Sequence, residues 1–186
     1  QLTRDGGTTW TDLTSRFNLP GPRWVSRVVA SRASAGAAYV VFDGHQDDDF
    51  KPYIFKTTDF GATWSSATGD MPDGMVVNAL VEHPRNAKLL FAGTEFGLFY
   101  TVDGGARWTH ARGNLPRVPV DDIVIEERSN DVVLGTHGRS IIVLDDITPL
   151  QQLTPTVLSS ASHVFEIGPA AQSLPNENGW FLGGRS

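Results

Sequence analysis

Acidic side chains are concentrated at one place in the sequence. Asp47, Asp48 and Asp49 follow His45, and Glu95 lies in a second turn-like segment. Glycoside hydrolysis uses two carboxyl groups that converge on one sugar, one as general acid and the other as base or nucleophile. Adjacent carboxylates can also supply the hard oxygen ligands that calcium prefers. An aspartate run is most often a solvated turn, and a calcium site at Asp47–Asp49 is the next alternative. Asp47, Asp48, Asp49 and Glu95 are therefore only weak catalytic candidates.

Seven further side chains have the chemistry of a binding surface: Arg23, Trp24, His45, Lys51, Phe96, His137 and Arg139. For three of them we favour a structural interpretation. His137 is typical of a loop histidine bonded to backbone, rather than of a base or a metal ligand. Arg139 can form an ion pair with Asp145 or Asp146, or meet an anionic ligand. Trp24 can stack on a sugar ring, but packing inside the protein is the commoner fate of tryptophan.

An internal repeat organises the chain around these residues. The pattern Thr-x-Asp-x-Gly-x-x-Trp, called the box below, occurs three times, and its tryptophans are 54 and 44 residues apart. Each box is followed by Asn-Leu-Pro or Asp-Met-Pro and then by an apolar run. A period near 44 residues is typical of four-stranded propeller blades. The box residues are Thr3, Asp5, Gly7, Trp10, Thr57, Asp59, Gly61, Trp64, Thr101, Asp103, Gly105 and Trp108.

The box is interpreted as a self-contained hairpin turn. Its aspartate can accept hydrogen bonds from nearby backbone N–H groups, and its glycine permits a positive φ. The threonine hydroxyl can cap the incoming strand, and the tryptophan can pack between sheets. Catalytic carboxylates must converge on one substrate, whereas one aspartate in each blade is spread around a ring. We therefore assign the box aspartates a structural role.

Each repeat contains four short apolar runs bounded by Gly, Pro, Asn and Asp, which is the strand signature. No segment sustains the 3.6-residue apolar period of a helix. The sequence predicts an all-β fold, a propeller of four-stranded antiparallel blades over residues 1–150 that is an incomplete ring in this chain. The expected units are a partial blade at 1–19, blades at about 24–70 and 76–115, and a three-stranded blade at 119–147. Residues 151–186 are interpreted as a strap or linker with one strand at His163–Ile167.

Antiparallel blades place alternate turns on opposite faces. The boxes are expected to share one face with the turns between the first and second strands. The other face then carries the turns between the second and third strands and the blade-to-blade connections. All the candidate catalytic and binding residues, with Asp73, fall on this second face, where loops on a rigid scaffold tend to carry function.

Composition excludes several kinds of partner. The chain has 186 residues, a net charge of -6 and no long basic run, so nucleic acid is not an expected partner. No apolar run approaches the roughly 20 residues that span a membrane. Without cysteine there is neither a disulfide framework nor a thiolate metal site. No cofactor is expected apart from the alternative of calcium.

The boxes resemble the Asp-box, or BNR, repeats of sialidases, xyloglucanases and sortilin-like propellers. The stretch 24–153 is also similar to the C-terminal part of the propeller in large bacterial BNR-like repeat proteins. The matching stretches are 43–45, 48–53, 93–98, 135–140 and 144–150. The resemblance implies an exported protein, extracellular or periplasmic, with a "glycosyl hydrolase" label that rests on the repeat. Sialidases use an arginine triad and a Tyr–Glu pair, and neither can be placed in this sequence.

Two functions follow as hypotheses. The first is a non-catalytic exported propeller that binds a protein or polymer, with a glycan or a protein as the candidate ligand, or that forms a subunit of a larger assembly. The second is a glycoside hydrolase, sialidase- or xyloglucanase-like, that uses the loop carboxylates opposite the boxes. Because a partial ring exposes strand edges and apolar faces, we also expect another chain, or another segment of the same polypeptide, to complete the propeller.

Overall fold

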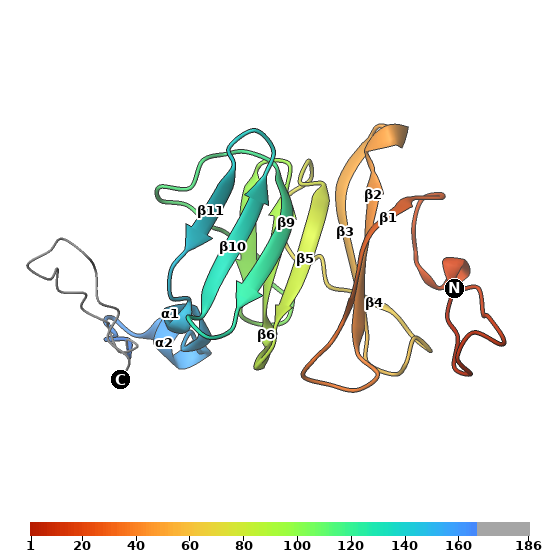
Figure 1. The fold of residues 1–186 in the computed structure, drawn as a ribbon, viewed down its shortest axis with the longest axis horizontal. Coiled ribbons are helices and arrows are strands. Elements are labelled where there is room, and N and C mark those ends of the chain that lie inside the picture. The colour runs from red at the N-terminus through yellow and green to blue at the C-terminus, as the bar shows by residue number, and fades with distance from the viewer. Residues whose placement is uncertain (167–186) are drawn as a thin grey trace, which may run out of the picture.

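The computed structural model describes residues 1–166 as three antiparallel β-sheets that stack side by side (Figure 1). The first sheet contains β1 (Trp24–Ala30), β2 (Ala38–Gly44), β3 (Asp49–Thr57) and β4 (Ser65–Ser66). The second contains β5 (Val77–His83), β6 (Asn86–Thr94), β7 (Gly97–Thr101) and β8 (Thr109–His110). The third contains β9 (Val120–Glu126), β10 (Asp131–Thr136) and β11 (Ile141–Leu144). The all-β fold with antiparallel four-stranded sheets is confirmed.

The order of strands within the sheets is that of propeller blades. Each sheet is a meander in which sequence neighbours pair, and the first strands β1, β5 and β9 contact one another in turn. Ion pairs also join the first sheet to the third beside these strands: Arg27 Nη2 lies 2.9 Å from Asp122 Oδ1, and Arg32 contacts Glu127. The first strands therefore line the side on which the three sheets converge.

Apolar side chains on both faces of the middle sheet hold the stack together. Side chains alternate between the faces of a strand, so Leu90 and the next residue, Phe91, enter different cores. Leu90 packs against Tyr39 of the first sheet, whereas Phe91 packs on the side of Leu134 in the third. The middle sheet is thus buried on both faces, which explains the near-continuous apolar run at 89–92.

The outer faces of the end sheets are apolar as well but remain exposed. Val25 and Val28 on β1 are exposed on the side away from the middle sheet. At the other end, Val124, Ile141 and Val143 are exposed on the third sheet. The register aligns Val124 and Val143 on either side of Val133, which makes an apolar row across that sheet. These two faces have the pattern of blade interfaces without a partner sheet.

The box turns contain the hydrogen bonds that their residue types predict. Thr57 Oγ1 donates to Asp59 Oδ1 at 2.8 Å and accepts from Gly61 N at 3.0 Å, while Asp59 Oδ1 accepts from Thr63 N at 2.9 Å. The same bonds recur in the boxes at 3–10 and 101–108. Hydrogen bonds from Thr63 lower the pKa of Asp59 to about 2. The box aspartates are therefore ionised acceptors of a turn.

The box tryptophans do not all pack between sheets. Trp108 is buried between the first and second sheets, and its Nε1 donates to Ala67 O at 3.0 Å. Trp64 is half-buried on the outer face of the first sheet. Trp10 is 58% exposed, and its Nε1 donates to Gly7 O within its own turn. The first box lies next to the first sheet through Arg4 and Arg16, which donate to carbonyls of the second box turn, and no sheet precedes it in the described residues.

The tail differs from the prediction. Short helices occupy α1 (Thr148–Gln151) and α2 (Pro155–Ser159), and Thr154 Oγ1 caps α2 by accepting from Val157 N. Residues 163–166 form no strand, and residue 167 lies outside the described residues. Helices of four and five residues are too short to show an apolar period. Within residues 1–166, no helix has the length and apolar character needed to cross a membrane.

Candidate functional site

Two faces of the stack carry different turns, as the sequence predicts. The turns β2–β3, β6–β7 and β10–β11 lie at one end of the strands, together with the sheet-to-sheet connections, and this end is called the loop face below. The box turns lie at the opposite end with the β1–β2 and β5–β6 turns. Gly104 N of a box donates to Lys88 O at 2.9 Å, and Phe60 N donates to Gly36 O at 2.9 Å. These bonds confirm that the boxes share a face with the first turns.

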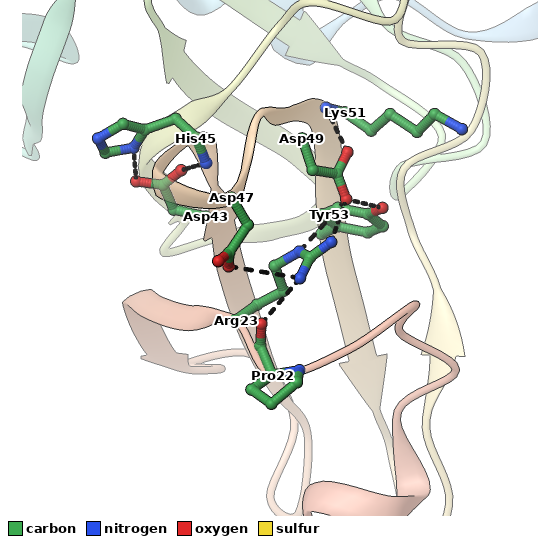
Figure 2. A network of polar contacts seen from close by, with 8 residues as sticks. All are labelled: Pro22, Arg23, Asp43, His45, Asp47, Asp49, Lys51 and Tyr53. Carbon is green, nitrogen blue, oxygen red and sulfur yellow. Dashed lines mark hydrogen bonds and ion pairs between the residues drawn. The ribbon is translucent and has the colours of Figure 1, made fainter.

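Arg23 organises the acidic segment of the loop face. Its Nη2 lies 2.7 Å from Asp49 Oδ2, its Nε lies 3.2 Å from the same oxygen, and its Nη1 lies 3.5 Å from Asp47 Oδ2. Tyr53 Oη also donates to Asp49 Oδ2 at 2.7 Å. Figure 2 shows the guanidinium lying between the two aspartates. We call Arg23, Asp47, Asp49 and Tyr53 the Arg23 cluster.

The local backbone creates the space for this cluster. A Cβ on Gly44 would lie 2.6 Å from Arg23 Nε, so a side chain there would displace the guanidinium. A 3-10 turn at His45–Asp47 follows Gly44, and Asp48 then adopts a left-handed conformation with φ 57. Aspartate is among the few residues that tolerate this conformation. The turn leaves Asp48 exposed and directs Asp49 at the start of β3 toward Arg23.

Burial and pairing fix the protonation of the cluster. The side chains of Arg23 and Asp49 are 10% and 15% exposed. The hydrogen bond from Arg23 holds the pKa of Asp49 below its ordinary value. Burial, with Asp49 as the second cause, raises the pKa of Tyr53 to about 12. Asp49 is therefore an ionised acceptor at neutral pH, the opposite of the raised pKa that a general acid needs.

The other polar residues of this loop point away from the cluster. His45 Nδ1 lies 2.6 Å from Asp43 Oδ2, and the backbone N of His45 donates to Asp43 Oδ1. In Figure 2 the His45 and Lys51 side chains extend to opposite sides of Arg23. His45 is thus held by its own loop, and Lys51 is exposed.

The calcium hypothesis does not fit this geometry. Among residues 1–166, no group of three or more His, Asp or Glu side chains is placed to hold a metal ion. Asp49 faces Arg23, while Asp47 and Asp48 lie on an exposed turn. A guanidinium occupies the position next to Asp49 where a cation would have to lie, so the sequence run does not become a ligand set.

Glu95 and Phe96 occupy the equivalent turn of the second sheet. Glu95 Oε1 accepts from Asn78 Nδ2 at 2.9 Å, which fixes it to β5 rather than to the Arg23 cluster. Phe96 is 45% exposed, and the Arg117 guanidinium lies 6.0 Å from its ring centroid. Arg117 was not among the sequence candidates because nothing in its local pattern marks it.

His137 and Arg139 lie in the corresponding turn of the third sheet. The backbone N of His137 donates to Pro119 O at 2.9 Å, and its ring Nδ1 lies 3.5 Å from Asp121 Oδ2. The predicted ion pair of Arg139 with Asp145 or Asp146 does not fit the topology. Arg139 precedes β11 and the two aspartates follow it, so they lie at opposite ends of that strand.

Comparison with known proteins gives a fold but no family. No family model matches the sequence, and no curated protein matches it. A GH74 enzyme of Niastella koreensis is similar in structure, with a TM-score of 0.53 and 21% identity, over 66% of this chain and 21% of that chain. The GH74 xyloglucanase of Xanthomonas campestris has a TM-score of 0.51 and 18% identity, over 66% and 22% of the two chains.

A third similar structure is of a different kind. YCF48 bound to D1 peptide has a TM-score of 0.50 and 17% identity, over 69% of this chain and 40% of that chain. The chain thus spans about a fifth of the GH74 proteins and two fifths of YCF48. Identities this low carry information about fold alone. All three are β-propellers, and together with the stacked four-stranded sheets they show that this chain folds as part of a β-propeller.

Proposed function

We propose that this chain belongs to a non-catalytic, exported propeller of the Asp-box type that binds a protein or polymer on its loop face. The observation that carries the proposal is the Arg23 cluster. A glycosidase needs one carboxyl group that holds a proton and a second that is ionised, both open to substrate. Here Asp49 is covered, ionised and bonded to Arg23 and Tyr53, so the best acidic candidate is already used inside the protein.

Exposed aromatic side chains support binding on the same face. Trp24 at the start of β1 is 64% exposed, and Phe50 at the start of β3 is 51% exposed. Phe96 adds a third exposed ring beside Arg117. The few residues that dominate the binding energy of protein interfaces are enriched in tryptophan, tyrosine and arginine. The rigid strand ends and the Arg23 cluster would hold Trp24 and Phe50 in place without catalysis.

The binding proposal predicts a difference between two tryptophans on opposite faces. Peptides selected from a random phage-displayed library on the immobilised protein should bind about 10-fold or more weakly to Trp24→Ala, a loss typical of interface hot spots. Trp10→Ala is the matched control, because Trp10 has a similar exposed fraction, 58% against 64% for Trp24, but lies on the box face. Fluorescence anisotropy with a labelled selected peptide gives both dissociation constants. Equal affinity in the two variants would contradict the assignment of the loop face.

Glycoside hydrolysis stays as the second candidate for one reason. Asp47 and Asp49 both approach the same guanidinium, so two carboxylates do converge on the loop face. Asp47 is 57% exposed and could meet a ligand. In this alternative, Arg23 would have to leave Asp49 when substrate binds.

The exposed end faces support the proposal that further blades complete the ring. Beside the first sheet lies a mostly apolar cavity of about 700 Å³. Trp64 Nε1 on this face is buried and has no hydrogen-bond partner among the described residues. The equivalent atom of Trp108 is satisfied by the neighbouring sheet. The residues lining the cavity include Leu13, Phe17, Val25, Val28, Val40, Phe42 and Trp64.

Ring completion predicts that the chain does not stay alone in solution. A native mass spectrum without denaturant should show an assembly heavier than the 20.2 kDa chain, because exposed apolar faces of this extent drive association. A second copy of the chain would appear as an integral multiple, and a different partner as another mass. A stable, soluble monomer of 20.2 kDa would overturn this part of the proposal.

A further inference from the structure

Within residues 1–166, the third sheet ends in an open strand edge at β11. In the described part of the chain, β11 pairs with β10 alone, whereas the equivalent strands β3 and β7 pair with the outer strands β4 and β8. Strand edges carry unpaired N–H and C=O groups that can bond another extended chain. The position of a fourth strand beside β11 is therefore a place where a segment can add to the sheet.

The repeat shows what a fourth strand brings to this position. In the second sheet, Trp108 immediately precedes β8 and is buried with Tyr39, Ile54, Ala67 and Met71 of the first sheet. Its Nε1 donates to Ala67 O at 3.0 Å. The outer strand thus carries a tryptophan that enters a notch on the neighbouring sheet.

The same notch exists one sheet further along. Phe91, Leu98, Ala111 and Leu115 of the second sheet occupy the positions that Tyr39, Ile54, Ala67 and Met71 hold in the first. Two matching bonds fix this equivalence, because Ala67 N donates to Ile54 O and Ala111 N donates to Leu98 O, both at 2.8 Å.

These four residues of the second sheet line a cavity of about 320 Å³. Its opposite wall includes Leu144 at the end of β11 and Ile147 and Leu150 of the following segment. The cavity therefore lies between the second and third sheets, next to the open edge. The cavity is at the position equivalent to that of Trp108 between the first two sheets. The third sheet, which has no box after β11, has no tryptophan to fill it.

We infer that the edge of β11 and this cavity form a peptide-binding site for an extended protein segment with a tryptophan, or a similarly large aromatic residue, at the start of its strand. The segment adds antiparallel to β11, as β8 adds to β7, and its aromatic side chain enters the cavity over Ala111. Main-chain bonds give such a site affinity, and the side-chain pocket gives specificity. The site continues the interface that already joins the first two sheets.

A peptide copied from this chain is the most direct probe. The labelled peptide TVDGGARWTHARGNL repeats residues 101–115, including a box and β8. Fluorescence anisotropy should show saturable binding to the protein, and replacement of the peptide tryptophan by alanine should weaken it about 10-fold or more. Ala111→Leu places a larger side chain in the cavity and should weaken binding of the intact peptide by a similar factor. Ala106→Leu is the matched control, because it makes the same substitution in the exposed box turn of the second sheet without lining the cavity, and it should leave binding unchanged.

Hydrogen exchange provides a second readout on the unaltered protein. Peptide binding should slow amide exchange at Ile141–Leu144, even if Ala111→Leu proves too unstable to use. The inference would be overturned if the peptide does not bind at millimolar concentration. It would also be overturned if the peptide binds without needing its tryptophan and without slowing amide exchange at β11. Trp24 lies on the loop face and outside this site, so the peptide site and the proposed loop-face function can fail independently.

Discussion

Phe91→Ala should reduce the free energy of unfolding by about 3–5 kcal/mol, the range for removing a large aromatic side chain from a packed core. Phe91 lies on β6 in the middle sheet and is 1% exposed. It packs between the second and third sheets, in the core that holds the third sheet to the stack. Little backbone movement can refill the space, because Leu90 anchors the same strand in the other core.

Urea unfolding followed by tryptophan fluorescence measures the effect of Phe91→Ala. Val164→Ala is the control, because Val164 is an apolar residue that lies outside the three sheets and is 91% exposed. Its replacement should cost no more than about 0.5 kcal/mol, as for other surface substitutions. Similar losses in the two variants would show that the sheets do not share the buried interface described above.

Gly93→Ala should destabilise the protein by about 1–3 kcal/mol, the usual cost of overpacking. A Cβ at Gly93 would lie 2.5 Å from Val120 O and 2.8 Å from Val120 Cγ1. The contact is with backbone of β9, so the third sheet must move away from the second to relieve it. This glycine therefore sets the closest approach of two neighbouring blades.

The repeat supplies a matched control for Gly93. Gly135 occupies the same position in the third sheet, since each glycine precedes the last threonine of its strand. A Cβ at Gly135 would meet Asp122 Cβ at 3.6 Å, an ordinary contact. Gly135→Ala should thus leave the free energy of unfolding unchanged, or raise it by up to about 1 kcal/mol, because alanine reduces the conformational entropy of the unfolded chain. Thermal or urea unfolding compares the two variants, and equal effects would contradict the proposed close packing at Gly93.

The parts of the fold that depend on nearby residues could be predicted from the sequence. The box turns follow from threonine, aspartate and glycine within five positions of one another, and their bonds are the ones expected. The apolar run at 89–92 predicts a buried strand. By contrast, α1 and α2 are too short to show a period, and Trp10 is exposed because no sheet precedes it in the described residues.

The site was predicted less completely than the fold. Sequence placed Arg23, Asp47 and Asp49 on one face, but it could not show that Arg23 pairs with Asp49, because these residues are 26 positions apart and belong to different elements. Tyr53 was missed as a partner for the same reason. Of the two alternatives for Arg139, the ion pair with Asp145 or Asp146 is favoured by their proximity in sequence, but an extended strand separates the arginine from both aspartates.

The most direct test of the non-catalytic assignment is the pKa of Asp49, measured by NMR titration of its side-chain carboxyl carbon. We expect a pKa below the ordinary 3.8, because Arg23 donates hydrogen bonds to this carboxylate. The ion pair then stabilises the fold above about pH 4 and is lost as the pH falls through the lowered pKa. Arg23→Met should raise the pKa, because the first cause of its lowering is removed. An Asp49 carboxyl group that titrates near 6, as a general acid does, would contradict this assignment and favour glycoside hydrolysis.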